Sequence, residues 1–188
     1  MKKINHKISE RNVTLELLIF EKEDKKLFTK TFDQWVKLNS IIKKELLGTR
    51  KTNFPESLSE PIFCLEMNFG KLIKAIGNKK YSTSFDCFDI KRDKRIQLKC
   101  SSSNGPTQFG PRSQYDEIYF IDFNVKGFVD GYYEIYKINN SDIDNVLVNK
   151  TQKLTDQQEE KRRARVNIRS KIIKPKNLQP IKTGNLKD

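Results

Sequence analysis

The feature that most constrains this chain is the stretch 84–100, in which two segments of alternating residue type flank a short basic turn. The segments read Ser-Phe-Asp-Cys-Phe-Asp-Ile (84–90) and Arg-Ile-Gln-Leu-Lys-Cys (95–100). Alternation with a period of two is typical of a β-strand, so the pattern predicts a β-hairpin that turns through Arg92 and Asp93. A hairpin determines which side chains share a face, and therefore what chemistry that face can present.

In the expected register Asp86 pairs with Lys99, and Phe88 pairs with Gln97. Asp86, Gln97 and Lys99 then share one face, because side chains alternate between the two faces of a strand. The other face of the second segment is apolar and suits a buried core. An acid, an amide oxygen and an ammonium group gathered on one face can bind a divalent cation and polarise a phosphate. The alternative is a solvated face with an ordinary Asp86–Lys99 pair.

Apolar residues recur with helical spacing from Pro61 to Gly77, which predicts a helix with Pro61 in its first turn. Glu66 lies inside the apolar stripe of this helix. A carboxylate directed toward a core is costly unless it is paired or binds a metal. We therefore expect Glu66 to point over the hairpin and complete an acidic cluster; the alternative is that it reaches solvent at the edge of the stripe.

The spacing of Asp86, Gln97 and Lys99, with a glutamate on the preceding helix, resembles the core motif of PD-(D/E)XK nucleases. Phe85 departs from that motif, which has a proline there, and Gln97 stands where an acid is usual. Branches resembling the Mrr nucleases also carry glutamine at this position. The resemblance implies Mg²⁺ as cofactor, held by Asp86, Gln97, the Leu98 carbonyl and Glu66. It also implies that Lys99 holds the attacking water or stabilises the charge that develops on the phosphate.

The flanking residues extend this resemblance. The segments Lys-Cys-Ser-Ser-Ser (99–103), Phe-Gly-Pro-Arg-Ser (109–113) and Asp-Glu-Ile-Tyr-Phe-Ile-Asp-Phe (116–123) resemble small type II restriction endonucleases. Among these the chain is most similar to the Bsp6I type, which cuts within the five-base site GC-any-GC. The resemblance covers roughly residues 66–173. It implies double-stranded DNA as substrate, 5′-phosphate ends, a homodimer with one active site for each strand, and a DNA methyltransferase encoded nearby.

Charge and length agree with a DNA-binding enzyme. The 188 residues fit a single domain spanning 1–188, and 37 Lys and Arg against 24 Asp and Glu give a formal net charge of +13. The only histidine, His6, excludes triads and zinc sites that need histidine. We find no apolar run long enough to cross a membrane and no hydrophobic leader, so we expect a soluble, cytoplasmic protein.

The order of the patterned segments predicts a mixed sheet flanked by helices, of the α/β or α+β class. Segment 13–20 is a strand or a short helix, and 32–47 is a helix that ends at Gly48. Further strands are expected near 117–123 and 128–138, and short helices over 140–148 and after Thr155. The three cysteines have no metal-binding spacing and are expected to be reduced packing residues: Cys64, Cys87 and Cys100.

Two segments are candidates for contacting DNA. The first is the loop 101–113, with Ser101, Ser102, Ser103, Asn104, Gln108 and Arg112 as donors and acceptors. The second is the basic segment 150–188, which carries 12 Lys and Arg and 4 Asp and Glu. Within it, polar residues alternate with small or apolar ones, and as a strand these polar residues would form one ribbon: Arg163, Arg165, Asn167, Arg169 and Lys171. Arginine pairs with guanine edges and asparagine with adenine edges, whereas lysines neutralise phosphates.

Bland alternatives exist for both segments, namely an ordinary surface loop and a solvated basic tail. Two other functions also stay open at this stage. A structure-selective nuclease, such as a junction resolvase or repair enzyme, would use the same metal site. A non-catalytic basic DNA-binding protein would use the ribbon alone, with Asp86 and Lys99 as a structural pair.

Overall fold

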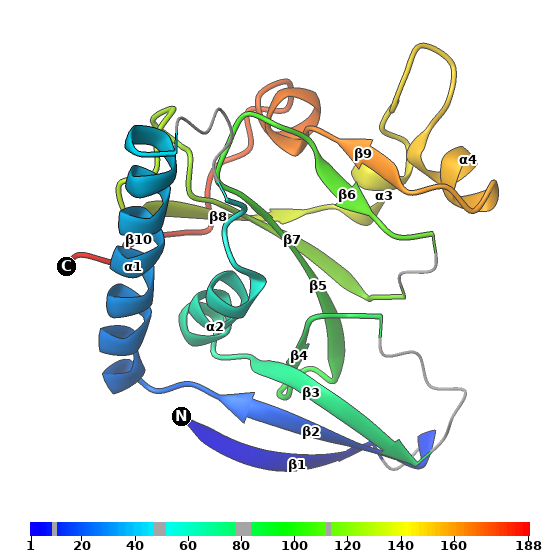
Figure 1. Ribbon diagram of the computed structural model, residues 1–188. Helices are drawn as coiled ribbons and strands as arrows, with labels where there is room; N and C mark the ends of the chain where they lie inside the picture. The colour runs from blue at the N-terminus through cyan, green and yellow to red at the C-terminus, as the bar shows by residue number, and fades with distance from the viewer. Residues whose placement is uncertain (9–10, 47–51, 78–83, 112–113) are drawn as a thin grey trace.

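The computed structural model describes residues 1–8, 11–46, 52–77, 84–111 and 114–188, and a mixed sheet of eight strands lies at its centre (Figure 1). The strand order is β1-β2-β3-β4-β5-β7-β8-β10, and every described neighbouring pair is antiparallel except β5 with β7. A second sheet pairs β6 with β9. The predicted class, a mixed sheet flanked by helices, is confirmed.

The strands are β1 (Lys2–Ile8), β2 (Val13–Ile19), β3 (Gly70–Gly77), β4 (Cys87–Asp89), β5 (Lys94–Ser101), β6 (Thr107–Phe109), β7 (Glu117–Asp122), β8 (Tyr132–Ile138), β9 (Ala164–Val166) and β10 (Lys182–Asn185). The helices are η2 (Lys22–Asp24), α1 (Lys25–Lys44), α2 (Glu56–Met67), α3 (Asn140–Asp144), α4 (Leu154–Glu159) and the single turn η3 (Arg169–Ile173).

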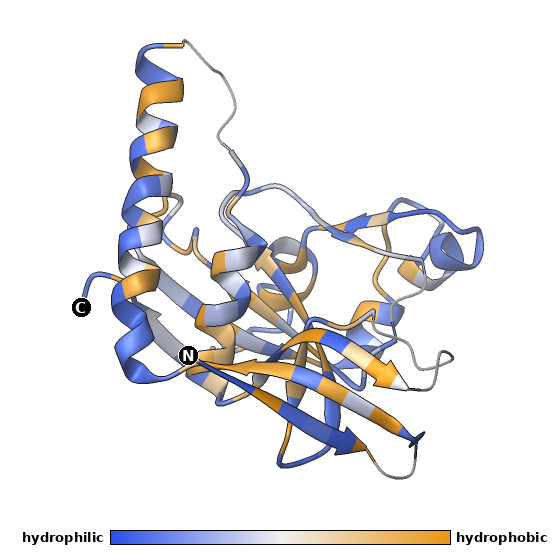
Figure 2. Ribbon diagram, turned by 60° about the horizontal axis from the view of Figure 1, so that its bottom comes forward, coloured by the Kyte–Doolittle hydropathy of each residue, from blue (hydrophilic) through white to orange (hydrophobic). Residues whose placement is uncertain are grey.

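Strand β7 divides its side chains between two hydrophobic cores. Tyr119 and Ile121 lie in the core beneath α1 and α2, whereas Ile118 and Phe120 lie in a second core with residues of β6, β9, α3 and α4. Figure 2 shows that hydrophobic and hydrophilic residues alternate along α1 and along the strands of the sheet. The strand expected near 117–123 is therefore present, and it lies inside the sheet with both of its faces buried.

The prediction of a helix over residues 61–77 is wrong for the second half of this range. Helix α2 ends at Met67, because Asn68 takes a left-handed conformation with φ 57° and its N–H caps the carbonyls of Cys64 and Leu65. The chain then continues as β3, which pairs with β2. Pro61 lies inside α2 rather than in its first turn, since the helix begins at Glu56.

The hairpin forms as predicted, but its register is shifted by two residues. Cys87 pairs with Ile96 and Phe88 with Arg95. The shift follows from Asp89, whose carboxylate accepts hydrogen bonds from the backbone N–H groups of Lys91 (3.0 Å) and Arg92 (3.2 Å) and so fixes the turn earlier. A shift by an even number leaves every side chain on its expected face.

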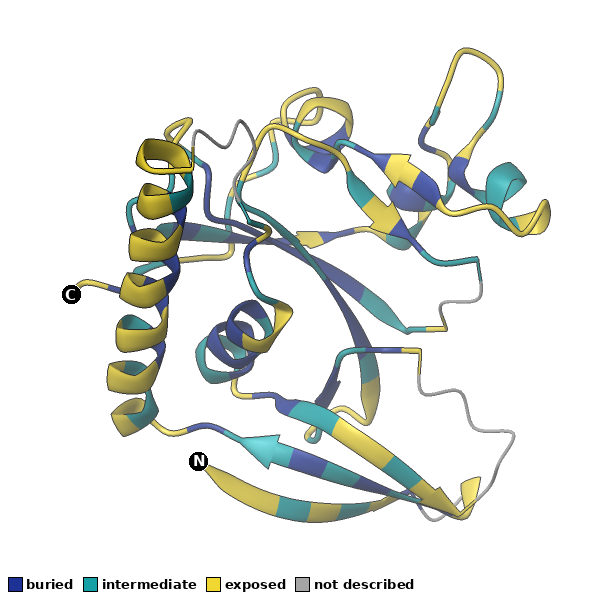
Figure 3. Cartoon of the chain, in the orientation of Figure 1, coloured by how far each residue is buried: buried dark blue, intermediate teal, exposed yellow. Residues whose placement is uncertain are grey.

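Other boundaries differ by a few residues. Segment 13–20 is a strand, α1 begins at Lys25, β8 begins at Tyr132 rather than near 128, and α3 ends at Asp144. In α1, Phe32 and Trp35 are buried, whereas Leu38 is exposed. Figure 3 shows that one side of this helix is exposed along its length. The expected helix end at Gly48 lies outside the described residues. No helix of the described chain is long and apolar enough to span a membrane.

Candidate active site

Asp86 is held in place between two strands immediately before β4. Its backbone N–H donates to the carbonyl of Ile96 (3.0 Å), and its carbonyl accepts from the N–H of Leu72 (3.1 Å). Its carboxylate atom Oδ2 accepts a hydrogen bond from the N–H of Leu98 (2.7 Å) and another from Nε2 of Gln97. Asp86, Gln97 and the backbone of Leu98 therefore meet, as the hairpin prediction required.

Asp86 lines a hollow of about 520 Å³ together with residues of α2, β5, β6 and β9. Lys99 from β5 lines the same hollow, together with Glu56 and Glu60 from α2. A second hollow of about 390 Å³ lies beside β3 and shares Asp86 and Glu60 with the first. The acidic groups thus stand where two adjoining depressions meet.

Glu66 does not take part in this cluster. Its carboxylate accepts a hydrogen bond from Tyr133 Oη on β8 (2.8 Å) and forms an ion pair with Lys182 on β10 (2.9 Å). Glu66 lines neither hollow. The expectation that Glu66 completes the acidic cluster is therefore not met. The side chain of Glu66 points from α2 toward β8 and β10. Another acidic residue of the same helix faces Asp86.

That acid is Glu60, six residues earlier on α2. Positions six residues apart are about 120° apart around a helix axis, so Glu60 and Glu66 lie on different sides of α2, and Glu60 faces Asp86 when Glu66 does not. Glu60 forms an ion pair with Lys71 of β3, at 2.8 Å. Glu56, four residues before it, lies on the same side of α2 and is exposed. Sequence analysis missed both residues because it started the helix at Pro61.

Burial shapes the electrostatics of the hollow. It raises the pKa of Asp86 to about 6, against a smaller lowering by the Leu98 N–H and by Lys99. Burial also raises the pKa of Glu60, which Lys71 partly offsets. The pKa of Lys99 is lowered, again by burial first, while Asp86, Glu56 and Glu60 act in the opposite direction. Two carboxyl groups and an ammonium group thus lie in one poorly solvated place.

The surroundings of Gln97 test whether a divalent cation fits. Its Nε2 group donates to Asp86 Oδ2 and lies 3.5 Å from the Leu98 carbonyl oxygen, so the positive end of this amide lies between two oxygen atoms. The two ends of a glutamine amide are exchanged by a half-turn, which would direct a third oxygen to the same place. An all-oxygen set suits Mg²⁺. The described residues contain no group of three His, Cys, Asp or Glu side chains that could hold a metal.

Lys99 also contacts the neighbouring sheet. Its Nζ atom lies 5.2 Å from the centre of the Phe109 ring on β6, within the range of a cation–π interaction. The predicted DNA-contacting residues that line the 520 Å³ hollow with Lys99 are Ser101, Ser102, Ser103, Gln108, Arg163 and Arg165. Arg112 lies outside the described residues.

The ribbon expected over 163–171 is a strand only in its first part. Ala164, Val166 and Ile168 are buried, which agrees with the predicted apolar anchor. After Val166, however, the chain leaves the strand and turns into η3. Asn167, Arg169 and Lys171 therefore do not continue one exposed face with Arg163 and Arg165.

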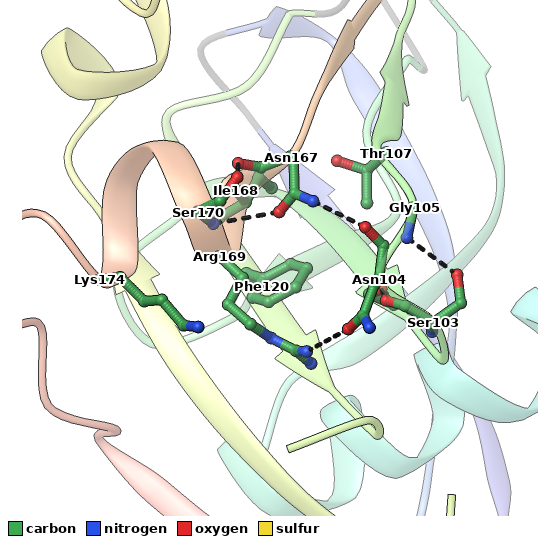
Figure 4. A pocket seen from close by; sticks show the side chains of 11 residues that line it. Ser103, Asn104, Gly105, Thr107, Phe120, Asn167, Ile168, Arg169, Ser170 and Lys174 are labelled. Atoms are coloured by element: carbon green, nitrogen blue, oxygen red, sulfur yellow. Dashed lines mark hydrogen bonds between the residues drawn. The ribbon is translucent and has the colours of Figure 1, made fainter. Parts of the chain in front are cut away.

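The side chains of those three residues instead bind other protein groups. Two of them, Asn167 and Arg169, line a neighbouring cavity of about 220 Å³ (Figure 4). Arg169 Nε donates to Asp122 Oδ2 (2.7 Å), and its Nη1 donates to Asn104 Oδ1 (3.1 Å). Asn167 Nδ2 donates to the carbonyl of Asn104 (2.7 Å). Lys171 Nζ donates to the carbonyls of Leu147 and Val148. Asn104 thus contacts protein groups on this side rather than the hollow of Asp86.

Comparisons with known proteins show the family to which the chain belongs. The profile of the Bsp6I restriction endonuclease family matches residues 20–175. The type II restriction enzyme Bsp6I of Bacillus sp. (strain RFL6) is 33% identical over 169 residues, which covers 86% of this chain and 90% of that protein. No solved structure matches the chain. Both the extent and the identity of these matches establish that the chain belongs to the Bsp6I restriction endonuclease family of type II, site-specific deoxyribonucleases.

Proposed function

We propose that this enzyme hydrolyses phosphodiester bonds of double-stranded DNA in an Mg²⁺-dependent reaction centred on Asp86. The observation that carries the proposal is the hollow that Asp86, Glu60 and Lys99 line together, with Arg163 and Arg165 at its β9 side. Acidic groups in the middle suit a cation, and arginines at the side suit a DNA backbone.

The residues that would hold Mg²⁺ are Asp86, Gln97 through its amide oxygen, and Leu98 through its carbonyl. When bound, the ion would polarise the scissile phosphate and acidify a water molecule. Lys99 would hold the attacking water or stabilise the charge that develops on the phosphate, where a preorganised donor contributes most. In-line attack by water would leave a 5′-phosphate and a 3′-hydroxyl.

Glu60 takes the role that the sequence assigned to Glu66. Its carboxylate borders both hollows and is ion-paired to Lys71, which orients it toward Asp86. From there Glu60 would accept a hydrogen bond from a water molecule bound beside Asp86. Glu66 is not included, because it lines neither hollow and binds Tyr133 and Lys182 on another side of α2.

We further propose that a homodimer cuts a short palindromic site, with GC-any-GC as the first candidate. Two-fold symmetry in the protein matches two-fold symmetry in the site and supplies one active site for each strand. A cognate DNA methyltransferase would protect the host DNA in the same cytoplasm. One domain comprising residues 1–188 would then contain both the catalytic and the DNA-contacting residues.

The test is digestion of plasmid DNA with Mg²⁺ and, in parallel, with EDTA, followed by sequencing of the fragment ends. We expect discrete fragments with 5′-phosphate ends in Mg²⁺ and intact plasmid in EDTA. Fragmentation without sequence preference would overturn the site-specific proposal in favour of a structure-selective nuclease. Lys99→Ala should lose cleavage and still bind DNA; unchanged cleavage by this variant would remove Lys99 from the mechanism.

A further inference from the structure

The β6–β9 sheet presents one polar face and one apolar face. Gln108 of β6 and Arg165 of β9 are directly opposed in the antiparallel register, so their side chains share a face. Both are exposed, whereas the residues of the other face, Phe109, Ala164 and Val166, are buried in the second core. Arg163, two residues before Arg165, also lies on the exposed side.

The polar face has hydrogen-bonding groups that the protein does not use. In the described part of the chain, the side chains of Gln108, Arg163 and Arg165 make no hydrogen bond or ion pair with another residue. The neighbouring Asn167, Arg169 and Lys171 are all engaged by protein groups. Of the five residues expected to form the ribbon, the two whose side chains stay unused, Arg163 and Arg165, therefore lie at β9 beside Gln108 of β6.

The sheet itself is held firmly. Asn167 is bonded to Asn104 at one end of it, and Gln158 Nε2 donates to the Gly110 carbonyl (2.7 Å) at the other. Thr107 Oγ1 donates to the Val166 carbonyl (3.1 Å) within it. Side chains on such a support are presented in a defined position, which direct recognition of a base requires.

The sheet also adjoins the catalytic residues. Gln108, Arg163 and Arg165 line the same hollow as Asp86 and Lys99. Lys99 Nζ lies 5.2 Å from the ring of Phe109, the residue next to Gln108. Because successive base pairs rise by about 3.4 Å along a strand, a group bound on this sheet lies within a few base pairs of a phosphate bound at Asp86.

We propose that the β6–β9 sheet enters the major groove of DNA and that Arg165 and Gln108 read adjacent base edges there. The major groove admits a two-stranded β-ribbon, and Arg165 would donate two hydrogen bonds to O6 and N7 of a guanine. Gln108 would bond the neighbouring base through its amide. Arg163, next to the loop at Gly110, would contact a backbone phosphate and carry no sequence preference. The inference rests on the proposed cleavage of double-stranded DNA and names the residues that choose the site.

The experiment compares full-length Arg165→Ala, Arg165→Lys, Gln108→Ala and Arg163→Ala with the wild-type enzyme on a pool of duplexes with randomised sequence. Cut ends are sequenced after digestion in Mg²⁺, and bound duplexes are sequenced after selection in Ca²⁺. We expect Arg165→Ala and Arg165→Lys to lose about 10- to 100-fold in cleavage of the wild-type site and to relax the preference at one G·C pair in each half-site. Gln108→Ala should relax the adjacent position.

Arg163→Ala is the matched control. It should bind all sequences more weakly, lower the slope of log K against log salt by about one, and keep the wild-type preference. The inference is overturned if Arg165→Lys and Gln108→Ala keep the full preference of a wild-type enzyme. If the wild-type enzyme does not cut in Mg²⁺, the proposed function fails by that arm alone, and the Ca²⁺ selection still reports whether Arg165 and Gln108 set the base preference.

Discussion

Two poorly solvated carboxylates lie on either side of β5, and they differ in the groups that neutralise them. Asp122, at the end of β7, is 3% exposed and is bound by the guanidinium of Arg169 and by the N–H of Asn124. Asp86, before β4, accepts hydrogen bonds only from uncharged groups of Gln97 and Leu98 among the described residues. A poorly solvated carboxylate that is paired with an arginine already has its charge neutralised. A carboxylate that accepts hydrogen bonds only from neutral donors keeps its charge and still favours a nearby cation.

Glu60 and Glu66 of α2 differ in place rather than in pairing. Each forms an ion pair with a lysine, Glu66 with Lys182 and Glu60 with Lys71. Glu66 lies away from the hollow and also binds Tyr133, whereas Glu60 borders the hollow beside Asp86. The position beside Asp86 is therefore what makes Glu60 the candidate for chemistry.

The largest expected effect is on the rate of DNA cleavage, in which Asp86 and Asp122 should differ. Asp86→Asn should lower the rate of cleavage by at least about 10³-fold and leave DNA affinity nearly unchanged, because it removes a charge needed in the transition state. Asp122→Asn should keep the cleavage rate of the folded enzyme within about tenfold. Single-turnover cleavage together with a DNA-binding titration measures both. Equal losses of rate in the two folded variants would break the comparison.

The next largest effect concerns the free energy of unfolding, in which Arg169 and Lys99 should differ. Arg169→Ala should lower the free energy of unfolding by about 3–5 kcal/mol, because it leaves Asp122 buried without its partner. Lys99→Ala should change it by less than about 1 kcal/mol, because removing the buried ammonium group offsets the loss of its ring contact and of its attraction to the nearby acids. Urea unfolding of both variants measures the difference. A larger loss in Lys99→Ala would assign Lys99 a structural role.

The pKa of Asp86 predicts a dependence of stability on pH. Its folded-state value of about 6 lies above the ordinary 3.8, so the folded protein loses stability as pH rises from about 4 to about 6. Asp86→Asn cannot ionise, and in EDTA it should be the more stable protein above pH 6, by about 1–3 kcal/mol. Below pH 4 the two should be equal. Thermal unfolding across pH measures this; a difference that grows toward acid pH would contradict it.

The smallest expected effect sharpens the contrast on α2. Glu60→Gln should lower the cleavage rate about tenfold, because the amide accepts a hydrogen bond from water less strongly than the carboxylate does. Glu66→Gln should leave the rate unchanged and lower stability by about 1 kcal/mol, through its contacts with Tyr133 and Lys182. The opposite assignment of rate and stability to these two variants would restore Glu66 as the site residue.

Predictions from the sequence were correct for those parts of the site that depend only on the local alternation of side chains along a strand. Alternation along the hairpin placed Asp86, Gln97 and Lys99 on one face, and that result survived a register error of two residues. Alternation along 163–168 predicted the buried anchor of Ala164, Val166 and Ile168 correctly. Both predictions depend only on the period of a strand.

The remaining errors arose where distant parts of the chain decide. The spacing of Leu72, Ile73 and Ile76 suited a helix, and only the pairing of β3 with β2 and the left-handed Asn68 made that segment a strand. Because the predicted helix began at Pro61, Glu60 was not recognised as a candidate site residue. The structural roles of Asn167 and Arg169 likewise depend on Asn104 and Asp122, which are far away in sequence.

Only residues 102–106 connect β5 to β6. If β5 holds the catalytic residues and β6 holds residues that read bases, only five residues of backbone separate the two. The recognition strand could then not be replaced as a separate unit without moving Lys99. New specificities in this family would then arise by side-chain replacement on the existing ribbon rather than by shuffling of domains. Engineers should therefore expect changes in target sequence and in turnover to come together.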